Sequence, residues 1–201
     1  MTPANDIGFQ LNKACAQGDL AAVQALAPQW DGLTYGKFLS TAVQSYQQPH
    51  HMNVVEYLLE LNNLPSEVAR AMEYATDGGH WDLLPVLAEY LDDYFCGVEL
   101  ERAARAGKTT AVQLLVSFAP PHFTLGGLNY ALTQKNDDIV DILAPLHSSE
   151  DVHKYLMGVK YKDNQDCIDY YTQWVTNQHT KKILTDVVQP HTNSDALRRK
   201  I

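Results

Sequence analysis

Long apolar runs, cysteines and positive charge are all scarce in this chain. Its 201 residues contain no stretch of about 18 consecutive apolar residues, so the sequence predicts no membrane-spanning helix. The three cysteines, Cys15, Cys96 and Cys167, are odd in number and far apart. Such a set argues against a disulfide framework and favours buried thiols in a reducing compartment. The formal net charge of −9 argues against a nucleic-acid binder and against adsorption to anionic membranes.

Motifs for catalysis are also missing. We find no nucleophile elbow, phosphate loop or dinucleotide fingerprint. His50, His51 and His80 come nearest to a metal-binding set, but their spacing matches no zinc motif. The acidic pair Asp137 and Asp138 is better placed to begin a helix, where carboxylates favour the positive end of the dipole. The sequence therefore predicts no catalytic residue, no cofactor and no metal.

The first residues, 1–6, lack the basic region and apolar core of a secretory signal. We therefore expect a cytoplasmic protein. We also expect it to be monomeric on its own. Delivery into a host cell by a route that uses no such signal stays open.

The main pattern that the sequence does contain is a small residue that recurs at a nearly constant interval. It stands at Ala14, Ala42, Ala75, Ala103 and Ala131, with Val159 in the sixth position. The successive steps are 28, 33, 28, 28 and 28 residues. A fixed period of this length is typical of repeat architectures, in which stacked units bury a shared core.

The residues that follow the alanine explain the repeat physically. In the fourth unit Ala103 is followed by Gly107, Val112 and Leu115, and the third, first and fifth units follow the same spacing. Alanine lets two helices approach closely. Glycine can adopt the left-handed conformation that ends a helix. The later apolar residues fall on one face of a second helix. Each unit is therefore predicted to be a short helix, a tight turn and a second helix.

The pattern Ala-Ala-x-x-Gly-x-x-x-x-Val-x-x-Leu, best seen from Ala103 to Leu115, resembles the middle of the ankyrin repeat over roughly residues 10–175. The Thr-Pro-Leu-His opening of that repeat is missing, and the period falls short of the usual length of about 33 residues. The missing residues fall where an ankyrin repeat carries its β-hairpin finger. The resemblance implies an all-α solenoid of about six stacked helix–turn–helix repeats with short or absent fingers.

We expect one repeat domain over residues 1–189 and a polar tail over 190–201. The predicted units are 10–28, 36–61, 66–91, 98–118, 126–145 and 150–175, followed by a terminal capping helix. The sixth unit is rich in tyrosine, which fits either a capping repeat or an aromatic contact patch.

The second unit contains an insertion. Aligning Val55 and Leu58 with their counterparts leaves four extra residues in the turn after Ala42. Insertions in repeats often map to the binding face. A longer loop that is merely tolerated is the alternative, because loop closure costs little.

The resemblance implies a module that binds another protein of unknown identity. In that family the contacts come from the residues just before the turn glycine and from the adjoining loops. Carried over to this chain, the predicted partner-binding residues are Tyr46, Gln47, Gln48, His50, His51, Asp77, Arg105, Gln134, Tyr161 and Lys162. Two alternatives remain: a microbial effector or inhibitor that acts on a host or partner enzyme, and an enzyme built on a helical-repeat scaffold.

Overall fold

The computed structural model describes residues 3–47, 49–61, 63–158 and 164–188, and these residues contain helices and no strand. The all-α class predicted from the sequence is therefore confirmed. Six helices open hairpins: α1 (Pro3–Gln17), α3 (Gly36–Gln44), α5 (Pro65–Gly78), α7 (Asp93–Arg105), α9 (Pro121–Gln134) and α11 (Ser149–Gly158). Their partners are α2 (Leu20–Leu26), α4 (Pro49–Leu59), α6 (Leu83–Ala88), α8 (Thr109–Leu115), α10 (Asp137–Leu143) and α12 (Asn164–Val188). Short 3₁₀ turns, η1 (Ala27–Gln29) and η2 (Ala144–Leu146), follow α2 and α10.

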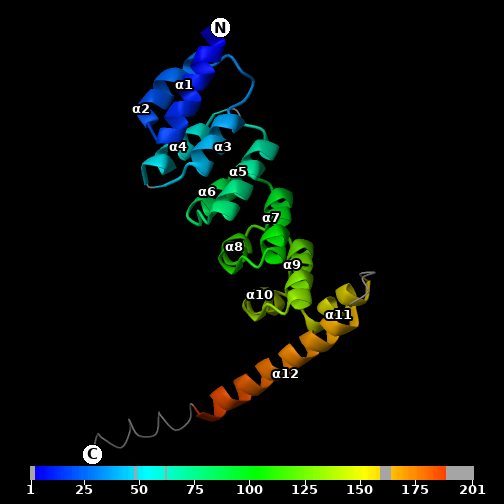
Figure 1. The fold of residues 1–201 in the computed structure, drawn as a ribbon. Coiled ribbons are helices and arrows are strands. Elements are labelled where there is room, and N and C mark those ends of the chain that lie inside the picture. Colours follow the sequence, from blue (N-terminus) through cyan, green and yellow to red (C-terminus); the bar gives the residue numbers. More distant parts are fainter. Residues whose placement is uncertain (1–2, 48, 62, 159–163, 189–201) are drawn as a thin grey trace, which may run out of the picture.

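The hairpins follow one another in a row. The first helices α1, α3, α5, α7 and α9 pack side by side in chain order. The second helices α2, α4, α6, α8 and α10 lie along the opposite side, and α12 crosses the end of the row (Figure 1). The buried apolar residues form one cluster that runs from Leu11 to Tyr171. Each hairpin covers part of its neighbour, so the core is shared between successive hairpins.

The turns of the first, third and fourth hairpins have the geometry that the glycine spacing predicts. Gly18, Gly79 and Gly107 have φ angles of 67°, 72° and 68°, in the left-handed region that glycine adopts without a steric penalty. In the third hairpin the amide of His80 donates to the Ala75 carbonyl at 2.9 Å, and the amide of Gly79 donates to Thr76. These two bonds make a Schellman motif, which satisfies carbonyls at the helix end.

The alanine and the glycine therefore belong to one structural unit. The carbonyls of Ala14, Ala103 and Ala131 accept the equivalent bonds from the residue after the left-handed position. In the fifth hairpin the left-handed residue is Lys135, with φ of 54°. All five alanines of the repeat are buried, each with 5% or less of its surface exposed. This explains why the spacing of four residues recurs while the neighbouring residues vary.

The second hairpin departs from the predicted loop. The sequence places all four extra residues in the turn, but α4 has 11 residues whereas α2, α6, α8 and α10 have six or seven. Part of the insertion therefore adds a helical turn at the beginning of α4. As a consequence, His50 and His51 lie on a helix and not in a loop.

The two ends of the chain also differ from the predicted units. Helix α1 begins at Pro3, before the predicted start of the first unit at residue 10, and proline is well tolerated at a first helical position. The second helix of the sixth unit and the separate capping helix are instead one 25-residue helix, α12 (Figure 1). Its sequence contains no glycine or proline to end it earlier.

Two substitutions test the packing. Ala103 and Leu115 are both fully buried. Ala103→Leu should lower the free energy of unfolding by about 1–3 kcal/mol because the close helix contact has no room for a larger side chain. Leu115→Ala should cost about 2–5 kcal/mol by opening a cavity. Denaturant melts measure both, and unchanged midpoints for both would contradict the repeat register.

Candidate functional site

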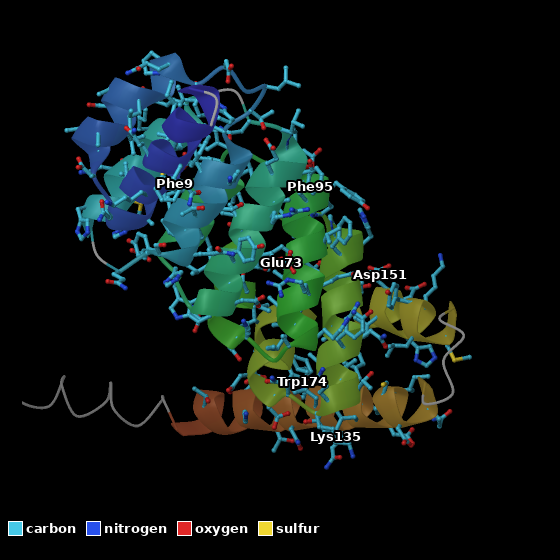
Figure 2. The ribbon with its side chains drawn as sticks, turned by 45° about the horizontal axis from the view of Figure 1, so that its top comes forward. Phe9, Glu73, Phe95, Lys135, Asp151 and Trp174 are labelled. Atoms are coloured by element: carbon cyan, nitrogen blue, oxygen red, sulfur yellow. The ribbon has the colours of Figure 1, made fainter. Side chains whose placement is uncertain are left out.

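The predicted partner-binding residues that the structure describes lie along one edge of the row, where first helices turn into second helices. We call this the turn edge, and it comprises residues 16–19, 44–47, 50–51, 77–82, 105–108 and 133–136. Lys135, labelled in Figure 2, marks its position in the fifth hairpin. Gln48, Tyr161 and Lys162 lie outside the described residues.

An aromatic cluster occupies the turn edge of the second hairpin. The Tyr46 hydroxyl donates to the carboxylate of Asp82 in the third hairpin, and its ring lies 5.2 Å from the ring of His80. The rings of His50 and His51 are 4.5 Å apart. Burial and the bond to Asp82 raise the pKa of Tyr46 to about 12. The insertion thus bonds to the next hairpin through its tyrosine.

His51 supports the turn and is not on the surface. Only 3% of it is exposed, and its Nε2 lies 3.2 Å from the carbonyl oxygen of Ala16 in the first hairpin. An added Cβ at Gly18 would press against the imidazoles of His50 and His51, so the glycine also makes room for them. The sequence places His51 among the contact residues, but its burial leaves it unavailable to a partner in this structure.

Asp77 joins the third hairpin to the fourth. Its Oδ1 accepts bonds of 2.9 Å from Lys108 Nζ and from Arg102 Nη1. Partial burial opposes ionisation of Asp77, but the bonds from Lys108 and Arg102 outweigh it and lower the pKa of its carboxyl. Arg102 is also held at 2.8 Å by each oxygen of Glu99, and its pKa is raised chiefly by that bond. Asp77 is therefore part of an ion-pair network that bridges two hairpins.

Arg105 and Gln134 connect the fourth hairpin to the fifth. The guanidinium carbon of Arg105 lies 4.5 Å from the centre of the Tyr130 ring, and Nη2 donates to the Tyr130 hydroxyl at 2.7 Å. Gln134 Nε2 donates to the backbone carbonyl of Arg105 at 2.6 Å. Cation–π contacts of this kind contribute about 0.5–1 kcal/mol at exposed sites.

Three of these contacts share one feature. The last carbonyls of a helix lack the amide partner that earlier carbonyls have, and here the following hairpin supplies a further donor. The Ala16 oxygen lies within bonding distance of His51, the Thr76 oxygen accepts from Lys108 and the Arg105 oxygen accepts from Gln134. The first, third and fourth turns are thereby tied to the hairpin that follows each of them.

Several predicted residues nevertheless remain accessible. Gln47, His50, Asp77, Arg105 and Gln134 are all exposed on the turn edge, whereas Tyr46 is half-buried. The turn edge is therefore a polar surface of mixed charge, in which Asp77, Arg105 and Gln134 also form bonds between hairpins.

Sequence reasoning missed four residues that anchor the turn edge, namely Asp82, Arg102, Lys108 and Tyr130. Among these, only Lys108 carries a recognisable signal, because it directly follows a turn glycine, as His80 does in the third hairpin. The others belong to one hairpin and bond to a different one, so their role depends on how the hairpins pack.

The described residues contain no group of three His, Cys, Asp or Glu side chains placed to hold a metal ion. None of the helices described is long and apolar enough to cross a membrane. Burial raises the pKa of the Cys15 thiol to about 12, which opposes formation of a nucleophilic thiolate there. The chemistry available at the turn edge is hydrogen bonding and ion pairing.

Comparisons with known proteins give no relative: no family model, no curated protein and no solved structure matches this chain.

The raised pKa of Tyr46 predicts a late step in an alkaline titration followed by tyrosinate absorbance. Its folded pKa lies above the ordinary 10.0, so the stability that it contributes is present below pH 10 and is lost as the pH rises towards 12. Tyr46→Phe should remove one tyrosine from the late step. Asp82→Asn should make that tyrosine titrate earlier, because the acceptor loses its charge. An unchanged titration in both variants would contradict the Tyr46–Asp82 bond.

The Asp77 network predicts coupling between hairpins. Asp77→Asn and Lys108→Met should each lower the free energy of unfolding, and a double-mutant cycle should give a coupling of about 0.2–1 kcal/mol, because the pair is partly exposed. The folded pKa of Asp77 is lowered, so its contribution is present above the ordinary value of 3.8 and is lost as the pH falls through the folded pKa. Strict additivity of the two substitutions would argue that the bond contributes nothing.

Proposed function

We propose that this chain is a protein-binding module, an ankyrin-like α-solenoid that acts in the cytoplasm and contacts its partner through the turn edge. The observation that carries the proposal is the row of exposed polar side chains, Gln47, His50, Asp77, Arg105 and Gln134, on successive hairpins. Beneath them the core positions are mostly apolar, with few buried polar residues such as His51 and Thr76. A constant core with a varied edge allows specificity to change without loss of the fold.

The rigidity of the edge supports the same proposal. The bonds from His51, Lys108 and Gln134 to the carbonyls of the preceding hairpin fix the turns relative to one another. A surface that is ordered before binding loses less conformational entropy when a partner binds. Its mixed charge suits a specific protein surface better than an apolar groove.

The test uses surface positions whose side chains do not bond another hairpin in the described part of the chain. Gln47→Arg with Ala106→Arg places two bulky cations on the turn edge, and both residues are exposed. Tyr46 and Arg105 are less suitable, because their loss would also weaken contacts between hairpins. The matched control, Gln24→Arg with Gln113→Arg, makes the same change in charge on the exposed faces of α2 and α8.

The measurement is capture of partner proteins from the native cell, identified by mass spectrometry. A partner captured by the unmodified chain should be lost with the turn-edge pair and kept with the second-helix pair. Both proteins should melt at nearly the same temperature as the parent. Loss with the second-helix pair alone, or no specific partner for the unmodified chain, would overturn the proposal.

A further inference from the structure

A second surface feature lies along the first helices and includes one residue of the turn edge, Gln44, in its lining. A hollow of about 500 Å³ lies between α3 and α5, and its lining includes Lys37, Leu64, Glu67, Arg70 and Tyr74. Helices α3 and α5 run side by side on the face presented in Figure 2. The hollow therefore spans the contact between the second and third hairpins.

The position of Glu67 depends on Gly36 at the beginning of α3. A Cβ at Gly36 would overlap the side chain of Glu67, so the glycine allows that side chain to lie close against α3. Glu67 Oε1 accepts a hydrogen bond from the Thr34 hydroxyl at 2.7 Å, and Oε2 accepts one from the Leu64 amide at 3.0 Å. Both oxygens of the carboxylate are thus already in use within the chain.

Two cations at this hollow are without partners among the described residues. Lys37 and Arg70 are exposed, and neither side chain forms a hydrogen bond or ion pair there. Elsewhere in the row, by contrast, Arg102 and Lys108 are held by carboxylates. In a chain with a formal net charge of −9, this hollow brings two such cations together in one lining.

We infer that this hollow binds an acidic peptide segment of the protein partner, with a carboxylate of that segment between Lys37 and Arg70. The guanidinium of Arg70 offers paired N–H donors that match a carboxylate, and Lys37 adds a second charge. Leu64 is 52% exposed and also lines the hollow, so an adjoining apolar side chain of the peptide packs there. The inference rests on the proposed function, since the occupant is part of a protein partner, and adds a site and its chemistry.

Because the whole chain is acidic, its affinity for an acidic peptide depends on cations that touch the peptide directly. The net charge of −9 repels an acidic peptide at long range, so any affinity has to come from the cations in direct contact. Both cations are exposed, so salt should weaken the complex markedly.

The experiment is fluorescence anisotropy with the purified full chain and a short labelled peptide of alternating glutamate and leucine. We expect saturable binding that weakens as salt is added. Lys37→Glu with Arg70→Glu should weaken it at least about tenfold. A peptide of alternating lysine and leucine serves as the opposite-charge probe and should bind the hollow no better in the parent than in that variant.

Two further variants separate local recognition from general attraction. Lys154→Glu with Lys182→Glu makes the same change in net charge at exposed positions of the last hairpin and should leave binding nearly unchanged. Lys37→Arg with Arg70→Lys should retain binding. An equal loss in both charge-reversed proteins, or no binding of the acidic probe to the parent, would overturn the inference.

The outcome is independent of the partner-capture experiment. Purified chain and synthetic probe report on the hollow alone, so a negative result here leaves the turn edge as the proposed contact. If the proposed function itself is wrong, the unmodified chain should fail to capture any specific partner.

Discussion

Every hairpin in this protein depends on burial of an apolar face that it cannot cover by itself. Helices such as α2 and α8 have seven residues, too few to be stable alone in water. Their apolar residues, including Val23, Val112 and Leu115, are fully buried because neighbouring helices pack over them. The free energy gained by apolar burial is therefore shared between hairpins, and it is obtained only when they stack against one another.

The Schellman turns fix the path of the chain within this packing. The carbonyl of the repeat alanine accepts a bond from the residue after the left-handed position, which sets the distance from Ala75 to Gly79 and from Ala103 to Gly107. At Lys135 the same geometry is adopted without glycine, because the surrounding bonds and packing hold it there. The turn, and not the identity of any surface residue, is what the repeat preserves.

Function is proposed for the surfaces that this framework leaves open. On the turn edge, side chains such as Lys108 and Gln134 have a structural role and hold adjacent turns in place, while Gln47 and His50 face outward. Between α3 and α5, a glycine and an internally satisfied glutamate leave Lys37 and Arg70 unpaired within the described residues. The two surfaces differ in chemistry, so one partner can use both without competition between them.

The sequence by itself determined the helical hairpins and their turns. Alanine volume, the left-handed preference of glycine and the apolar period are local properties, so Ala14, Gly18 and Val23 could be assigned correctly without coordinates. The continuous helix α12 could also be predicted from the sequence, because no glycine or proline interrupts residues 164–188. It was not predicted because residues 150–175 were assigned to a repeat unit that ends within this helix.

Only the tertiary structure decided which side chains meet between hairpins. The bond from Tyr46 to Asp82, the bonds from Lys108 and Arg102 to Asp77, and the burial of His51 join residues 25 to 36 positions apart. Such pairs depend on the separation and angle of neighbouring helices, which are set by the summed packing of many small side chains. No local pattern in the chain encodes those quantities, and for the same reason the pairing of Lys37 with Arg70 at one hollow became visible only in three dimensions.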